Sequence, residues 1–320
     1  METCNSTAET GFLILGFSDF SFDGVLLTCF MVIYVVTLLG NLLIISVIVL
    51  NPPLQQPMNF FLCNLSLVDM SLSTAVLPKL LVNRVMQTQR ISFRGCLSQM
   101  YFFTCFGNME NLVLVVMSYD RYVAICKPLQ YVFVMDRRTC VLLVAVSFLF
   151  VNAHSWLHTA LTARLCYCGA HEIRHFFCEM TALLHLSCSD TSLNELLIFT
   201  EGSLSIKVPF LLIVISYFHI LASVLKIPSA QGRLKTFSTC CSHLMSVSLF
   251  YGSLFFIYFR PSSLYSVGND RFVSIMYTTI TPMLNPFIYC FRNQEVKKIL
   301  RKHIRMTYSG KRRKCRFSCN

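Results

Sequence analysis

The sequence predicts an all-α membrane protein: a bundle of seven transmembrane helices followed by a short C-terminal amphipathic helix. Three observations support this fold class. The 320 residues are 55% hydrophobic and only 13% charged, with a mean hydropathy of +0.60, whereas soluble domains carry roughly a quarter charged residues. Apolar runs recur along almost the whole chain, each long enough to supply the about 20 residues that cross a bilayer. Short polar or basic segments separate these runs.

The seven spans are expected at residues 25–50, 57–82, 96–125, 139–163, 193–225, 235–259 and 272–291. Asn51-Pro52-Pro53 ends the first span, because proline cannot continue a helix. Residues 1–24 form a polar N-terminal segment, and residues 25–291 form the transmembrane domain. In residues 292–320, apolar side chains at helical spacing among basic ones predict an amphipathic helix on the membrane, followed by a basic tail.

The placement of lysine and arginine orients the chain in the membrane. Of the 27 basic residues, 18 lie in the loops and tail on the side of the C-terminus and 8 on the other side. Because basic residues favour the cytoplasmic side, we expect a multi-pass plasma-membrane protein with an extracellular N-terminus. Asn5-Ser6-Thr7 would then be available for N-glycosylation. A basic tail also suits nucleic acid, but in a multi-span chain it favours anionic lipid, so no nucleic-acid partner is expected.

Asp120 and Arg121 lie side by side at the inner end of the third span, within MSYDRYVAIC (Met117–Cys126). Charges this close to hydrocarbon are costly, so they are rare unless they are paired or functional. One interpretation is an ion pair at the membrane edge whose side chains reach water. The other is a lock that holds a receptor inactive until the helices move.

Asp69 and Glu110 are acids within the predicted second and third spans. Two buried carboxylates that lie close together cannot both be ionised cheaply, so one holds a proton or a cation lies between them. The sequence leaves both alternatives open: a cation site, or a network of neutral, hydrogen-bonded acids with Asn285.

Four cysteines, Cys96, Cys168, Cys178 and Cys188, fall in segments that we expect outside the cell, where disulfides persist. The long loop of residues 164–192, which holds three of these cysteines, also carries His171 and His175, which could suggest zinc, but the spacing matches no recognised zinc finger. Disulfides are therefore the favoured interpretation.

Several stretches together resemble one family, the odorant receptors within the rhodopsin-like G-protein-coupled receptors. They cover essentially residues 10–300, in the order and at the spacing of that family. The short N-terminal segment and the loop with three spaced cysteines resemble its tetrapod-type (class II) branch. The chain departs from the family pattern at Asn59, Phe148 and Thr236. The matching stretches are Pro57–Asp69, Met117–Cys126, Pro128–Tyr131, Ser216-Tyr217, Lys235–Leu244 and Pro282–Asn293.

This resemblance implies roles for particular residues. Arg121 would pair with Asp120 at rest and reach toward the G protein, Tyr217 and Tyr289 when active. Sodium at Asp69 and Glu110 would have Asn41 and Asn285 nearby. Disulfides would join Cys96 to Cys178 and Cys168 to Cys188, which leaves Cys166 without a partner. The coupling residues implied are Asp120, Arg121, Tyr122, Tyr217, Asn285, Pro286 and Tyr289.

The implied ligand pocket lies among the outer halves of spans three to seven. Glu201 is the notable member, since an acid in a pocket wall favours an amine ligand or pairs internally. Lys207 follows six residues later, roughly 240° around the helix, and is not an obvious partner. For most pocket positions, simple helix packing remains an equal alternative. The pocket residues are Phe103, Thr104, Gly107, Asn108, Asn111, Ile198, Glu201, Gly202, Ser205, Tyr251, Leu254, Phe255, Tyr258, Ile275 and Thr278.

The predicted function is an odorant receptor that binds a small volatile ligand and activates a stimulatory heterotrimeric G protein, raising cAMP. No catalytic residues and no cofactor besides sodium are expected, since the chain shows no Ser-His-Asp arrangement, phosphate loop or HExxH motif. One alternative is a rhodopsin-like receptor for a non-odorant ligand. The other is an ion-coupled transporter, against which the two halves of the chain show no matching broken helices.

Overall fold

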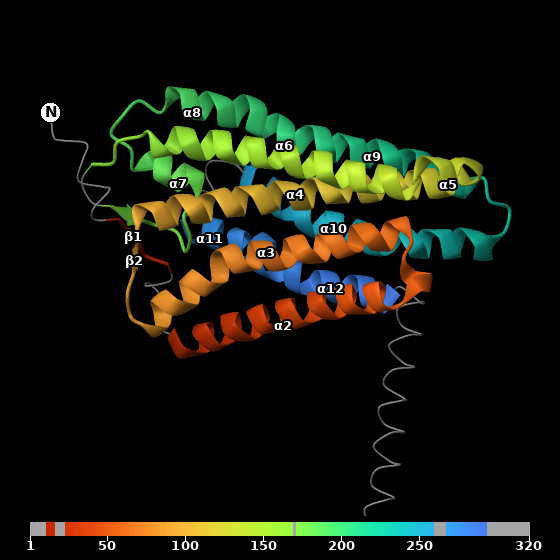
Figure 1. Cartoon of the computed structure of the whole chain (residues 1–320), viewed down its shortest axis with the longest axis horizontal. Helices are drawn as coiled ribbons and strands as arrows, with labels where there is room; N and C mark the ends of the chain where they lie inside the picture. The colour runs from red at the N-terminus through yellow and green to blue at the C-terminus, as the bar shows by residue number, and fades with distance from the viewer. Residues whose placement is uncertain (1–10, 17–22, 169–170, 259–266, 293–320) are drawn as a thin grey trace, which may run out of the picture.

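The computed structural model describes residues 11–16, 23–168, 171–258 and 267–292, which form an elongated bundle of helices (Figure 1). The N-terminal segment to residue 10, including Asn5, and the C-terminal segment from residue 293, with the predicted amphipathic helix, lie outside the described residues. Within the described part, six helices are long and apolar enough to cross a membrane. A seventh, divided span completes the predicted seven-helix bundle.

The spans follow the prediction closely. The first four are α2 (Asp23–Leu50), α3 (Pro57–Val85), α4 (Phe93–Cys126) and α6 (Arg137–Ala163). The fifth consists of α8 (Ser192–Leu197), the π-helical turn η3 (Ile198–Gly202) and α9 (Ser203–Leu225), and the sixth is α10 (Ala230–Tyr258). The seventh consists of α11 (Val267–Ile275), the π-helical turn η5 (Met276–Ile280) and α12 (Thr281–Arg292).

Local sequence signals explain where several helices begin. The Ser92 side chain accepts a hydrogen bond from the Gly95 amide at 3.1 Å, and Asp136 accepts one from the Thr139 amide at 2.8 Å. Each satisfies one of the backbone donors left free in a first helical turn. Pro57 occupies the first position of α3, where its missing N–H costs nothing. Short elements complete the loops: η1 (Pro52–Leu54), η2 (Pro128–Gln130), α5 (Tyr131–Val134) and α7 (Met180–His185).

Helix α4 runs through the middle of the bundle and contacts α3, α6, α9 and α10 (Figure 1). Its buried side chains join those of the neighbouring helices in one large apolar core, with Met117 and Leu114 at most 1% exposed. Helix α2 approaches α12 closely at Gly40, where a Cβ atom would lie 3.2 Å from the ring of Pro286. A glycine therefore allows these two backbones to meet.

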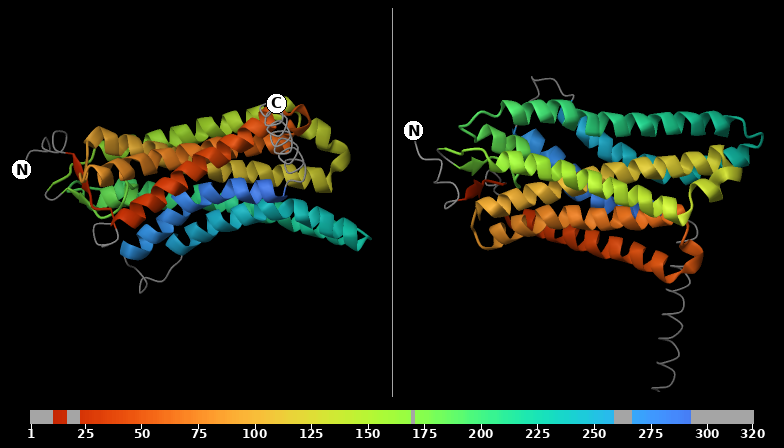
Figure 2. Two further views of the ribbon diagram at one scale, coloured as in Figure 1. Left: turned by 90° about the horizontal axis from the view of Figure 1, so that it is seen from below. Right: turned by 45° about the horizontal axis from the view of Figure 1, so that its top comes forward.

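A small sheet covers one end of the bundle, and the sequence did not predict it. Strand β1 (Phe12–Ile14) lies between β2 (Arg90–Ile91), with which it is antiparallel, and β3 (Glu172–Ile173), with which it is parallel. Gly11 precedes β1 with φ of +68°, and a Cβ there would lie 2.3 Å from the Ile91 carbonyl oxygen. The sheet lies at one end of the bundle, and α12 runs toward the other end (Figures 1 and 2). Below, the end that carries the sheet is called the sheet end and the other the coupling end.

Candidate ligand pocket and coupling site

At the coupling end, Asp120 is bound by a neighbour that the sequence analysis did not single out. The Tyr131 hydroxyl, from α5, donates a 2.9 Å hydrogen bond to Asp120 Oδ1. The predicted pair between Asp120 and Arg121 does not occur among the ion pairs of the described residues, and the buried Nε of Arg121 has no hydrogen-bond partner. The carboxylate and the guanidinium still attract each other electrostatically. The resting pair thus remains a prediction, and Tyr131 holds Asp120 in this structure.

His243 connects three helices at the same end, although the sequence analysis assigned it no role. The Tyr217 hydroxyl of α9 lies 2.7 Å from His243 Nδ1 on α10, and His243 Nε2 lies 3.0 Å from the Leu114 carbonyl oxygen on α4. A carbonyl only accepts, so Nε2 carries the proton and Nδ1 accepts from Tyr217. The two rings also stack, with centroids 5.6 Å apart. Tyr217, a predicted coupling residue, is thereby tied to α10.

The predicted sodium site lies in the middle of the bundle, where Asp69 and Glu110 are at most 1% exposed. Asn285 donates a 3.0 Å hydrogen bond to Asp69 Oδ2 and accepts one of 2.9 Å from Ser246. Asn41 instead donates to backbone carbonyls, including that of Pro282 at 3.2 Å. The other Asp69 oxygen and one Glu110 oxygen have no hydrogen-bond partner among the described residues, so they are available to a cation.

The other predicted coupling residues lie on α4 and α12. Tyr289 is 4% exposed within the apolar core, and Tyr122 packs against that core from α4. Pro286 lies inside α12 one residue after Asn285, where it removes a backbone donor. The Asn285-Pro286 pair thus lies at the acid site, where Asn285 bonds Asp69.

In the predicted ligand pocket, α4, α9 and α10 meet at Asn111. The Tyr251 hydroxyl donates a hydrogen bond to Asn111 Oδ1, and Asn111 Nδ2 donates one of 2.8 Å to the Ser205 carbonyl oxygen. Asn111 and Tyr251 are each 2% exposed. These contacts bring together three of the predicted pocket residues from three different spans.

Other pocket residues surround this junction. A Cβ added to Gly107 would meet no atom within 4 Å, so there is open space beside this face of α4. Toward the sheet end, Phe103 packs against Phe177 of the long loop, with ring centroids 4.5 Å apart, and against Tyr277 at 5.9 Å. Asn108 turns its amide to the Thr104 carbonyl of its own helix at 3.0 Å.

The remaining predicted pocket residues are distributed over the fifth, sixth and seventh spans. Leu254 and Phe255 pack against the main apolar core, and Ile275 packs against the cluster that contains Phe176 and Phe177. Thr278 is fully buried, but its hydroxyl donates to the Ser274 carbonyl of its own helix at 2.6 Å. The Tyr258 side chain lies outside the described residues. Ile198, Glu201 and Gly202 all lie in the η3 turn.

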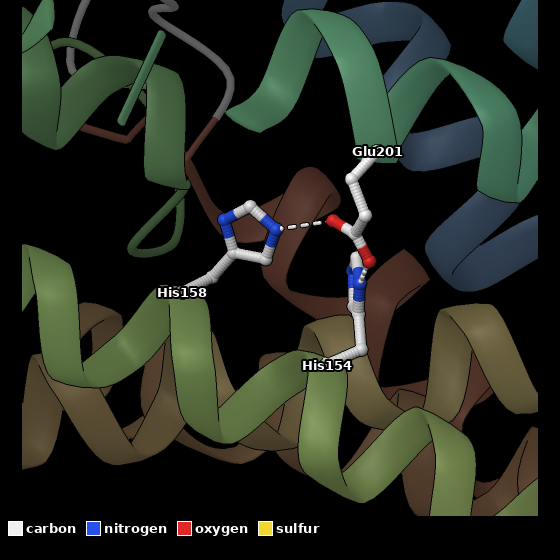
Figure 3. A group of neighbouring side chains, drawn as sticks. All are labelled: His154, His158 and Glu201. Carbon is white, nitrogen blue, oxygen red and sulfur yellow. Dashed lines mark hydrogen bonds and ion pairs between the residues drawn. The ribbon is translucent and has the colours of Figure 1, made fainter. Parts of the chain in front are cut away.

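Glu201 pairs internally, with two histidines of α6 (Figure 3). One carboxylate oxygen contacts His154 Nδ1, and the other lies 2.8 Å from His158 Nε2. Lys207 is exposed and is not the partner, as expected. The sequence carried one signal for this group, the i, i+4 spacing of two histidines on one helix face, but it did not show which acid they would face.

Both predicted disulfides are present at the sheet end. Cys96 is joined to Cys178 and Cys168 to Cys188, with Cα–Cα distances of 5.4 and 5.7 Å. The prediction that Cys166 lacks a partner was wrong, because Cys166 is disulfide-bonded as well. A cavity of about 580 Å³ also opens at this end, between β1, α2 and the end of α3. It lies apart from the predicted pocket residues, none of which lines it.

Comparisons with known proteins agree with the sequence resemblance. The profile of the family described as "Olfactory receptor" matches residues 30–307. Olfactory receptor 1f45 of Rattus norvegicus is 49% identical over 97% of this chain and 100% of its own length. Olfactory receptor 1G1 of Gorilla gorilla gorilla is 50% identical over 95% of this chain and 97% of its own length. The crystal structure of squid rhodopsin superposes with a TM-score of 0.67 at 19% identity, covering 88% of this chain and 80% of that one, which supports the fold.

Proposed function

Because this multi-pass membrane chain belongs to the olfactory receptor family, whose members are receptors rather than enzymes, we propose that it binds a small volatile ligand among α4, the fifth span, α10 and the seventh span. Binding would activate a stimulatory heterotrimeric G protein and raise cAMP. Such a ligand would bind mainly by apolar burial, at about 25 cal/mol per Å², with few polar groups to orient it.

One observation carries the proposal: α10 contacts both the pocket and the coupling site. Tyr251 of α10 bonds Asn111 in the pocket. His243, eight residues earlier on α10, bonds Tyr217 and the Leu114 carbonyl. Eight residues correspond to about 12 Å along the axis. An outward swing of α10 would therefore change both sets of contacts together, so a ligand that prefers one position of α10 would shift the population at the coupling end.

The proposed orientation places the sheet end outside the cell and the coupling end in the cytoplasm of the plasma membrane. The disulfides at the sheet end support this direction, because disulfides persist in oxidising compartments. The predominance of lysine and arginine in the loops of the other side supports it independently.

A sodium ion is proposed at Asp69 and Glu110, with Asn285 beside it. The residues fit such an ion: two buried carboxylate oxygens lack hydrogen-bond partners among the described residues, and sodium prefers oxygen ligands. The two carboxyl groups repel each other when charged, which a cation between them would relieve. Bound sodium would hold α3 and α4 in one relative position and would thus favour the resting bundle.

The test is a screen of volatile panels on cells that express the chain with a cAMP reporter. We expect dose-dependent cAMP increases to some volatiles, and no increase in the same cells after deletion of the stimulatory G-protein α subunit. A ligand response that survives this deletion would contradict the choice of G protein. Responses confined to peptides would contradict the proposed ligand class.

A further inference from the structure

We infer that His154, His158 and Glu201 form a binding site for a divalent transition-metal ion such as Zn²⁺, between α6 and the η3 turn of the fifth span. The inference rests on side-chain geometry alone, so it stands or falls independently of the proposed receptor function.

The three side chains converge from two helices on one small volume (Figure 3). Their ligating atoms are one ring nitrogen from each histidine and one carboxylate oxygen of Glu201, and all three lie within 4.8 Å of one another. In a tetrahedral zinc site with bonds of about 2.0–2.1 Å, donor atoms are about 3.3 Å apart. Small side-chain rotations would therefore bring these atoms to bonding distance without moving the helices.

The types of donor match a known coordination chemistry. Two imidazoles and one carboxylate form the His₂Glu set that binds zinc while leaving a fourth position open for water or another ligand. Imidazole nitrogens favour Zn²⁺, Cu²⁺ and Ni²⁺ over Mg²⁺ and Ca²⁺, which prefer oxygen ligands. The site should thus discriminate between these two classes of ion.

Burial makes the group more than a chance surface cluster. The His154 and His158 side chains are 7% and 2% exposed, and that of Glu201 is 34% exposed. A carboxylate and two imidazoles in a membrane-spanning region are costly unless their charges are balanced. The partial exposure of Glu201 leaves an ion access to the site.

The local helix geometry also aims Glu201 at α6. His154 and His158 are four residues apart and so lie on the same face of α6. Glu201 lies in the π-helical turn η3, which interrupts the α-helix of the fifth span. Such turns are rare and occur frequently at functional sites. An ion held by both elements would link the fourth span to this turn.

The test is Co²⁺ binding to the purified full-length chain in lipid nanodiscs, followed by visible absorption, since four-coordinate Co²⁺ absorbs strongly and reports Zn²⁺ by displacement. We expect the wild type to bind Co²⁺, to release it to Zn²⁺ and to ignore Mg²⁺. His158→Gln and Glu201→Gln should each lose this binding by more than the roughly 10–100-fold that loss of an outer partner costs. The matched controls His185→Gln and Glu195→Gln, which alter exposed residues of the same end, should bind like the wild type.

A ligand-preserving variant guards against variants that simply fail to fold. His154→Cys keeps a metal ligand, so it should retain Co²⁺ and add a thiolate-to-cobalt charge-transfer band in the near ultraviolet. Absence of Co²⁺ uptake by the wild type would overturn the inference. Equal uptake by the wild type, His158→Gln and Glu201→Gln would also overturn it, since the ion would then be bound elsewhere. A His154→Cys protein that binds Co²⁺ without the new band would exclude His154 from the site.

Discussion

The Tyr217 hydroxyl of α9 donates a 2.7 Å hydrogen bond to Nδ1 of His243 on α10, and the other nitrogen of that ring donates to the Leu114 carbonyl of α4. One imidazole thus holds three spans together. His243 is fully buried, so both of its bonds lie in a region that water does not reach.

We therefore predict that His243→Phe raises the basal cAMP signal. The substitution keeps an aromatic ring beside Tyr217 but removes both bonds that tie α10 to its neighbours. A net hydrogen bond contributes about 0.5–1.5 kcal/mol, so the equilibrium should shift by roughly 2–10-fold for each bond. Basal reporter output, normalised to surface expression, measures the effect.

Tyr217→Phe is the companion variant and should behave differently. Tyr217 is also the proposed partner of Arg121 in the active bundle, so its hydroxyl contributes to both conformers. We expect a smaller maximal response to agonist and little rise in basal signal. Identical phenotypes of the two variants would contradict separate roles for the two side chains.

Gly107 tests the location of the pocket. A side chain here would enter open space beside α4. Gly107→Leu should leave surface expression intact and raise the agonist concentration needed for half-maximal response by about tenfold or more, corresponding to about 1.4 kcal/mol of lost binding. Gly24→Leu is the control, since its added atoms also meet no neighbour but lie at the start of α2. A normal dose–response curve for Gly107→Leu with agonists of every size would place the ligand elsewhere.

Sodium should stabilise the purified protein through Asp69. At a sodium concentration ten times its Kd, binding adds about 1.4 kcal/mol, or a rise of roughly 2–5 °C in the unfolding midpoint. The measurement compares NaCl with choline chloride at equal ionic strength. Asp69→Asn should abolish the difference, while Glu195→Gln, an exposed acid, should keep it. The same sodium effect in wild type and Asp69→Asn would show that the ion binds at another position.

The long loop at the sheet end should lose stability in acid because of His175. Its ring is 4% exposed, stacked on Phe176 at 4.7 Å. Burial, together with the positive charge of Arg271, lowers the pKa of His175 from 6.5 to about 3. Glu179 lies 3.8 Å from Nε2, which is too far for a hydrogen bond and does not offset the burial.

The sign follows from proton binding. Between about pH 6.5 and 3 the unfolded loop binds a proton at residue 175 and the folded loop does not, so folding is increasingly opposed as pH falls. Above about pH 6.5 the His175 ring is neutral in both the folded and the unfolded loop, so this opposition to folding is absent. Hydrogen exchange of the loop amides should accelerate as pH falls through this window, after correction for intrinsic rates. His175→Phe should show a weaker dependence; an unchanged one would assign the effect to other groups.

The spans were predictable because bilayer thickness sets their length and charge or proline ends them. Asn51-Pro52-Pro53 marked the end of α2 directly, and α4 extends the predicted third span by only a few residues. The two π-helical turns and the three short strands were not predictable. Strands of two or three residues have too little pattern of their own. Strand β1 forms because its amides meet the carbonyls of His171 and Gln89.

For the candidate site, sequence reasoning identified residue types more reliably than partners. Asp69 and Asn285 came together as expected, because two charged or polar groups buried in hydrocarbon must find each other. The partner of Asp120 was not found, since Tyr131 lies beyond a loop whose fold depends on tertiary contacts. Likewise, Glu201 was recognised as unusual, but only the packing of α6 beside η3 shows that His154 and His158 face it.

The most direct test of the account is the agonist-stimulated cAMP response of Arg121→Ala, measured beside its surface level. Arg121 lies at the coupling end, where its buried Nε has no hydrogen-bond partner in the part of the chain that the structure describes, and we propose that it makes the contact that activates the G protein. We predict normal surface expression and no cAMP response, whereas Arg137→Ala, an exposed arginine at the start of α6, should respond like the wild type. An undiminished response from Arg121→Ala would contradict the proposed coupling mechanism.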